Sequence, residues 1–284
     1  MKIVYGLVLA AMLIAGESSQ AQEIILFEDT FNDSMTTVDD GVPNTSVSGL
    51  LANTAGSNYN LLGSLTSSMN GAGFGTFTED GGVATLINDN FADAAVFTLA
   101  DFATNADVIA SGQLIVELDD VTAPTNPEDQ FSLAILGQDN LPGNITIADN
   151  TPTILGLRFF SDGGFTENVG QMELTEIDEG AFDASSPFDV RLEITDLQVV
   201  GINPDPDTGL GGFSYEVFVN GTSIETGALA AGILDNVHVA FASRDTAGGS
   251  IGNFRVSTVV AVPEPTSLAL FGVVGLGLAV RRRR

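Results

Sequence analysis

The chain has 284 residues, a formal net charge of −28, one histidine and no cysteine. Phosphate backbones repel so acidic a protein, which excludes nucleic acid as a partner. The absence of cysteine excludes a disulfide framework and a thiol nucleophile, and with a single histidine it also excludes conventional zinc sites.

In chain order, the first predicted element is a signal helix. A charged start, Met1 and Lys2, precedes an apolar run over 3–15, and cleavage is expected after Ala21.

The exported body is expected to span residues 22–261 and to fold as an all-β domain. No stretch has a helical period, whereas short β-like runs alternate with Gly, Asn, Asp and Pro. The clearest strand is 190–195, in which Val190, Leu192 and Ile194 share one face. A second stripe over 213–219 runs into Asn220 and Gly221, the signal of a type I′ hairpin. Further strands are predicted at 24–27, 83–87, 95–99, 114–118, 131–136, 154–160, 171–177, 222–226, 237–241 and 253–259. Their number and spacing predict a two-sheet antiparallel sandwich.

Three short segments narrow this prediction by resemblance. Residues 25–33, 215–222 and 251–256 resemble strands of the concanavalin/laminin-G-like jelly rolls, in the same chain order. The resemblance implies a jelly roll whose first and last strands are neighbours. Residues 36–82, rich in Gly, Ser, Asn and Thr, are expected to form long loops along the edge of the sandwich.

Two segments contain candidate catalytic residues. His238, on the strand 237–241, is predicted to point away from the apolar side chains as a surface or sheet-face histidine, and no nucleophile elbow accompanies it. Glu176 and Asp178 match the first half of the motif of laminarinase-type glycoside hydrolases, which the sandwich resembles. Gly180 stands where that motif needs its acid/base, and the chain has no tryptophan for a sugar platform. We therefore expect no enzyme.

One loop has the spacing of a metal site. Asn203, Asp205 and Asp207 place oxygen ligands at alternate positions, as calcium loops begin, but the loop lacks the sixth-position Gly, and Ser214 replaces the final Glu. A proline-stiffened turn is the first interpretation, and a low-affinity structural calcium is the alternative. No other cofactor is expected.

The last 23 residues, 262–284, have a tripartite layout. Val262, Pro263, Glu264 and Pro265 precede an apolar helix over 268–280, and Arg281, Arg282, Arg283 and Arg284 end the chain. The arginines should stay on the cytoplasmic side of a membrane. The apolar segment spans about 21 Å, which is short for a permanent anchor in a hydrocarbon core of about 30 Å. An ordinary single-pass membrane anchor is one alternative interpretation of this layout. A Gram-positive sortase signal, which requires the sequence Leu-Pro-x-Thr-Gly, is another.

This tail resembles the PEP-CTERM sorting signal of Gram-negative bacteria. The resemblance implies an exosortase and the export machinery as partners, and membrane attachment through the tail before processing. It further implies delivery to the cell envelope or to an extracellular biofilm matrix that contains exopolysaccharide. The first hypothesis is therefore a non-enzymatic exported protein. A carbohydrate-binding module that acts on exopolysaccharide is the alternative, and a glycoside hydrolase is third.

Overall fold

The computed structural model describes residues 20–31, 59–61, 76–80, 82–87, 94–98, 100–126, 130–137, 153–169, 172–177, 179–197, 213–229, 236–244 and 248–262. The chain forms two compact units, Met1–Ile24 with Val259–Arg284, and Ile25–Thr258. The second unit carries the fold described below. Within the ranges above, no helix has the length and apolar character needed to span a membrane. The predicted signal helix and the C-terminal apolar helix lie outside the described residues.

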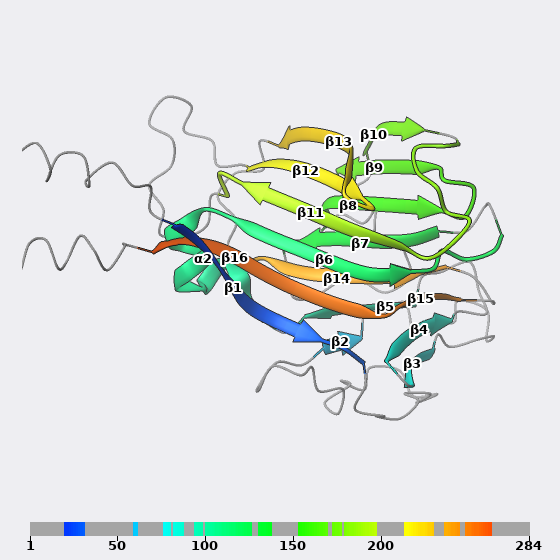
Figure 1. The fold of residues 1–284 in the computed structure, drawn as a ribbon, viewed down its shortest axis with the longest axis horizontal. Coiled ribbons are helices and arrows are strands. Elements are labelled where there is room, and N and C mark those ends of the chain that lie inside the picture. The colour runs from blue at the N-terminus through cyan, green and yellow to red at the C-terminus, as the bar shows by residue number, and fades with distance from the viewer. Residues whose placement is uncertain are drawn as a thin grey trace, which may run out of the picture. The chain divides into compact units, whose positions relative to one another are not determined.

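In the part of the chain that the structure describes, the strands form three sheets (Figure 1). The six-stranded sheet has the order β1 (Gln20–Asp29), β16 (Asn253–Val262), β6 (Leu114–Val121), β11 (Phe188–Thr195), β12 (Phe213–Val219) and β13 (Thr222–Leu229). The seven-stranded sheet has the order β10 (Met172–Ile177), β9 (Phe165–Val169), β8 (Thr153–Phe160), β7 (Gln130–Leu136), β14 (His238–Ser243), β5 (Ala94–Thr98) and β2 (Tyr59–Leu61). The three-stranded sheet has the order β15 (Gly249–Ile251), β4 (Val83–Ile87) and β3 (Thr76–Asp80). The body is therefore all-β, and β1 and β16 are neighbours as predicted.

The six-stranded sheet has the alternating pattern that the sequence predicts. In β11 the apolar side chains of Val190, Leu192 and Ile194 are buried, while Arg191 and Glu193 turn to the opposite face. Strand β12 alternates in the same way and pairs antiparallel with β11. At Asn220 and Gly221 the φ angles are 50° and 73°, so both turn residues have the positive φ of a type I′ hairpin. The predicted hairpin between β12 and β13 is confirmed.

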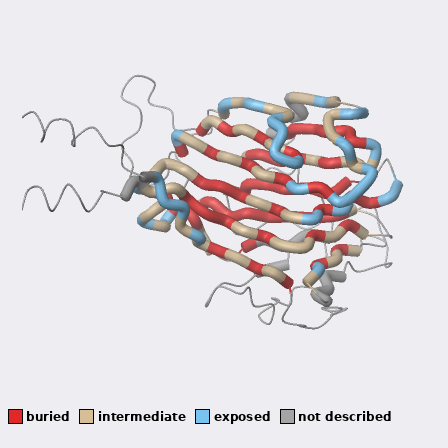
Figure 2. Tube along the Cα trace, in the orientation of Figure 1, coloured by how far each residue is buried: buried red, intermediate tan, exposed pale blue. Residues whose placement is uncertain are grey.

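The core lies between the six-stranded and the seven-stranded sheets. The ring of Phe254 on β16 packs against Phe27 of β1, with ring centroids 5.3 Å apart, and against Phe241 of β14, at 5.1 Å. All three side chains are fully buried. Because β14 belongs to the opposite sheet, these rings join the two layers. Figure 2 shows the buried positions running along the strands of both sheets.

The two large sheets differ in how their outer faces are covered. Every residue of β7 and of β14 is buried, whereas β11 and β12 alternate between buried and half-buried or exposed residues. At its centre the seven-stranded sheet is thus covered on both faces. The outer face of the six-stranded sheet, the face turned away from the core, remains in contact with solvent. The side chains on this outer face are therefore accessible to a ligand.

Short elements account for most differences from the prediction. Strands β2 and β3 lie within 36–82, where only loops were expected, and β9 and β15 were not predicted. These strands have three to five residues, too few to establish an alternation. The helix α2 (Ala106–Ser111) follows the 3₁₀ turn η2 (Phe102–Thr104). It is only six residues long, below the length at which a helical period can be recognised, and the Asn105 side chain caps its first turn.

Strand β13 ends the six-stranded sheet, so one side of its backbone has no neighbouring strand in that sheet. The Thr226 backbone N–H, which points away from β12, donates a hydrogen bond of 3.0 Å to the Glu225 carboxylate. A side chain of the strand itself therefore occupies one of the backbone donors that an edge strand leaves unpaired.

Candidate functional site

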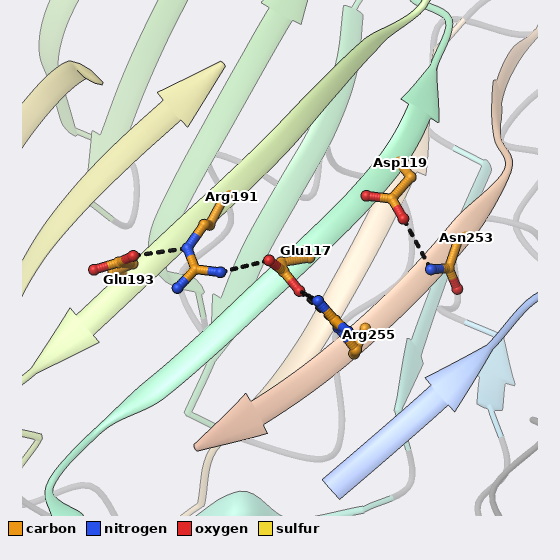
Figure 3. Close-up of polar contacts among 6 residues, drawn as sticks. All are labelled: Glu117, Asp119, Arg191, Glu193, Asn253 and Arg255. Carbon is orange, nitrogen blue, oxygen red and sulfur yellow. Dashed lines mark hydrogen bonds and ion pairs between the residues drawn. The ribbon is translucent and has the colours of Figure 1, made fainter. Parts of the chain in front are cut away.

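A row of alternating charges crosses the outer face of the six-stranded sheet (Figure 3). The strand register sets Glu117 of β6 directly between Arg191 of β11 and Arg255 of β16. Arg191 Nη1 lies 2.5 Å from Glu117 Oε1, and Arg255 Nε donates to Glu117 Oε2 at 2.6 Å. Arg191 Nε also donates to Glu193 Oε1, at 2.7 Å, on its own strand. Four side chains from three strands thus form one continuous ion-pair row.

The row concentrates positive charge that is scarce in this protein. Only four arginines and no lysine lie between residues 22 and 261, and two of the four contact the single carboxylate of Glu117. Glu117 is also the most enclosed member, because its side chain is 14% exposed and that of Arg191 is 36% exposed. Burial lowers the pKa of Arg191, but the hydrogen bonds to Glu193 and Glu117 outweigh it and raise that pKa. The row therefore sets side chains of opposite charge next to one another on the sheet.

The alternation of sign breaks at the next strand. Glu193 pairs directly with Glu216 of β12, so two carboxylates lie opposite each other on one face. Like charges in this position destabilise a sheet. Arg191 balances Glu193, but Glu216 makes no hydrogen bond or ion pair with any residue that the structure describes.

A hollow of about 350 Å³ surrounds this break. Its side chains come from neighbouring positions of three strands, because Thr195 pairs with Ser214 and Glu216 pairs with Thr226. The lining residues are Glu193, Thr195, Ser214, Tyr215, Glu216, Thr226 and Gly227. The three hydroxyl groups and the Glu216 carboxylate bond to no described residue, whereas Glu193 Oε1 accepts from Arg191 Nε.

Beneath the hollow, a buried hydrogen bond links the two large sheets. Tyr215 of β12 and Glu167 of β9 both point into the core and are 4% and 2% exposed. The Tyr215 hydroxyl donates to Glu167 Oε1. Burial raises the pKa of Glu167, the bond from Tyr215 lowers it, and the nearby Glu225 charge raises it again, with a net increase. A Cβ on Gly227 would lie 2.1 Å from the Tyr215 hydroxyl, so the tyrosine needs a glycine beside it.

His238 lies on the sheet face opposite the core residues Val239 and Phe241, as predicted, but it is buried and does not reach the surface. Its side chain is 3% exposed, because β14 lies between β5 and β7 in a sheet that is covered on both faces. The ring Nδ1 lies 2.9 Å from the Thr98 carbonyl oxygen and 3.0 Å from that of Ala100. Since carbonyl groups only accept hydrogen bonds, Nδ1 carries the proton and donates it. The histidine therefore holds the chain that follows β5 in position.

Polar atoms are also buried on the outer face of the seven-stranded sheet. Gln130, Ser132 and Asn168 are at most 3% exposed and share that face by register, since Ala134 pairs with Gly156, which pairs with Asn168. Gln130 Nε2, Ser132 Oγ and Asn168 Oδ1 make no hydrogen bond to any residue within the described ranges. Because their surface is enclosed, this set offers no accessible site comparable to the hollow.

The predicted metal and sorting residues fall mainly outside the described ranges. This applies to Asn203, Asp205 and Asp207, to Pro263, Glu264 and Pro265, and to Arg281, Arg282, Arg283 and Arg284. Ala21 lies in β1 and is exposed, and Val262 is the last residue of β16. No group of three or more acidic or histidine side chains that could hold a metal occurs within the described part of the chain.

Two residues at the broken hydrolase motif, Glu176 and Glu179, lie within the described part of the chain. Glu176 lies on β10 and is exposed, as is Glu179, and Asp178 is outside the described residues. Sequence reasoning missed the hollow. Its only signal was that Glu193 and Glu216 sit at outward positions of two predicted strands, which does not reveal that they are paired.

Comparison with known proteins identifies the C-terminal motif. Residues 261–284 match the PEP-CTERM protein-sorting motif, so the chain carries the signal of an exported protein that an exosortase processes. No curated protein matches the chain.

Solved structures resemble the body in architecture. The carbohydrate recognition domain of Emp46p, in its metal-free form, is 9% identical, with coverage of 69% of this chain and 94% of that chain and a TM-score of 0.42. The CBM2 module of the Lactobacillus casei BL23 phage J-1 evolved Dit is 11% identical, with coverage of 86% and 99% and a TM-score of 0.47. The carbohydrate-binding module CBM66 from Bacillus subtilis is 11% identical, with coverage of 65% and 91% and a TM-score of 0.37. At these identities and scores we derive no function from the likeness.

Proposed function

We propose that the protein is an exported, non-enzymatic β-sandwich that an exosortase-type system delivers to the cell envelope or the extracellular matrix. In this proposal residues 1–21 are a signal peptide, 22–261 are the exported domain and 262–284 are the sorting tail. The observation that carries it is the match of residues 261–284 to the PEP-CTERM motif. The first two residues of the match, 261 and 262, are the last two of strand β16.

The absence of catalysis in this proposal rests on the carboxylates. A glycosidase needs one carboxyl group in an environment that keeps it protonated, facing a second one at about 5 Å or more. Glu176 is exposed on an edge strand. Glu193 and Glu216 lie opposite each other, but on a solvent-facing sheet surface, and Arg191 holds Glu193 as an ion-pair partner.

Fractionation of the native host tests the sorting proposal. The mature protein should be recovered from the envelope or the matrix, and mass spectrometry of its C-terminus should find a chain that ends before Arg281. Replacement of Pro263, Glu264 and Pro265 by alanine should leave export intact and retain an uncut protein in the inner membrane. Mature protein that still carries the four terminal arginines would contradict processing.

A second candidate function is binding of carbohydrate. The hollow on the six-stranded sheet supports it, because hydroxyls and carboxylates are the groups that bind sugar hydroxyls. Its three hydroxyls and the Glu216 carboxylate bond to no described residue, and Glu193 is held by Arg191. A glycan array probed with the full chain tests this candidate. Binding that disappears when Thr226 is changed to valine, and survives Thr104→Val at an exposed threonine elsewhere, would support it.

A further inference from the structure

The charge row on the six-stranded sheet alternates in sign until it reaches the hollow. Arg255, Glu117, Arg191 and Glu193 follow one another as cation, anion, cation and anion, and each bonds to the next. The fifth position, Glu216, repeats the negative sign. A positive charge between Glu193 and Glu216 would restore the alternation and relieve the repulsion between them. No described residue supplies it.

The surroundings of the missing charge indicate a ligand that also carries hydroxyl groups. Ser214, Thr195 and Thr226 flank the two carboxylates at neighbouring register positions. Their hydroxyls can donate and accept hydrogen bonds, and none is used within the described structure. A metal ion fits less well, because the hollow has two carboxylates and no third acidic or histidine ligand.

The overall charge of the protein favours a positively charged ligand. With a net charge of −28, the protein repels polymers of uronic acids or sulfated sugars and attracts cations. A ligand that combines hydroxyl groups with a positive charge complements the side chains that line the hollow. Its charge is also opposite to the net charge of the protein.

We propose that the hollow binds an amino-sugar unit with a free ammonium group, as occurs in a deacetylated polysaccharide. The ammonium lies between Glu193 and Glu216, and the sugar hydroxyls bond to Thr195, Ser214 and Thr226. This inference rests on the carbohydrate-binding candidate and adds the charge of the ligand to it.

Calorimetric titration of the full chain, purified in mild detergent, tests the inference. The probes are a β-linked tetramer of glucosamine and its fully N-acetylated counterpart, which has similar hydroxyls and no positive charge. We expect the glucosamine tetramer to bind about tenfold more tightly, which corresponds to one charge-assisted hydrogen bond. Glu216→Gln should weaken its binding by about tenfold and leave the binding of the neutral tetramer nearly unchanged. Glu179→Gln, at an exposed glutamate in the bend after β10, is the matched control for charge and should change neither.

Two further probes separate the alternatives. Tetralysine tests diffuse attraction, and affinity equal to that of the glucosamine tetramer would overturn the inference, since no hydroxyl would be needed. Calcium ions that bind alone at the hollow, and are lost in Glu216→Gln, would overturn it in favour of a metal site. Equal binding of the two tetramers would overturn the positive-charge requirement while supporting the carbohydrate-binding candidate. If neither tetramer binds, both the amino-sugar inference and the carbohydrate-binding candidate are wrong, and the sorting proposal is unaffected.

Discussion

The Tyr215 hydroxyl donates a hydrogen bond to the Glu167 carboxylate, and this bond links a strand of the six-stranded sheet to a strand of the seven-stranded sheet. Both side chains are almost completely buried. A carboxylate in such a place costs free energy unless it is paired, and a negative neighbour, Glu225, adds to that cost. The pair therefore makes the stability of the sandwich depend on the protonation of Glu167.

Glu167→Gln should stabilise the protein at pH 7 by about 1 kcal/mol. The folded-state pKa of Glu167 is raised, so the stability that this residue contributes is complete below its unfolded-state pKa and is lost as pH rises through the folded-state pKa. Glutamine still accepts the bond from Tyr215 and has no such dependence. The difference in free energy of unfolding between variant and wild type, from urea melts at pH 4 to 7, should therefore grow with pH. A constant difference would contradict this assignment.

Tyr215→Phe removes the donor and leaves a buried carboxylate with one hydrogen bond fewer. The expected cost at pH 7 is about 1–3 kcal/mol of unfolding free energy. In the Glu167→Gln background the cost should be smaller, because a neutral amide is less costly to leave unpaired. A double-mutant cycle at pH 7 measures this coupling, and additive effects would mean that the hydroxyl acts independently of Glu167.

Leu192→Ala should cost about 2–5 kcal/mol, because the side chain is fully buried in β11 and its loss opens a cavity. Arg191 has two ion-pair partners, so we expect Arg191→Ala to cost about 1 kcal/mol, a loss that shrinks in high salt. Urea melts of both variants at low and high sodium chloride measure these losses. Equal losses at the two positions would contradict the assignment of Leu192 to the buried face and Arg191 to the outer face.

Added salt should raise the melting temperature of the full chain. With a net charge of −28, self-repulsion opposes the compact state, and screening shortens its range from about 30 Å at 0.01 M salt to about 10 Å at 0.1 M. Calcium at matched ionic strength should raise the melting temperature more than sodium. If the loop 203–209 is a specific site, the rise should saturate and disappear in the double variant Asp205→Ala with Asp207→Ala. If calcium raises the melting temperature no more than sodium does, solubility remains as the role of the acidic charge.

The sequence predicted those features of the fold that depend on neighbouring residues. The stripe of Val190, Leu192 and Ile194 was readable because side chains of a strand alternate, and the Asn220–Gly221 turn because both residues tolerate positive φ. The burial of His238 was not predicted, because alternation indicates which face a side chain takes and not whether that face is covered.

The candidate site depends on contacts between distant residues, which explains why it was missed. Arg255 and Glu117 are separated by 138 residues, and only the register of β16 on β6 brings them together. The pairing of Glu193 with Glu216 likewise follows from the register of β11 on β12. A single sequence contains the charges but not the pairing of its strands.

The bond between Glu225 and the Thr226 backbone bears on how copies of this protein behave when they are crowded together. An uncovered edge strand is a template on which another chain can add a strand and start a fibril. Here a carboxylate occupies one of the backbone donors that such a strand would need, and it presents negative charge to an approaching copy that is itself acidic. This contact disfavours the addition of a second copy of the chain at β13.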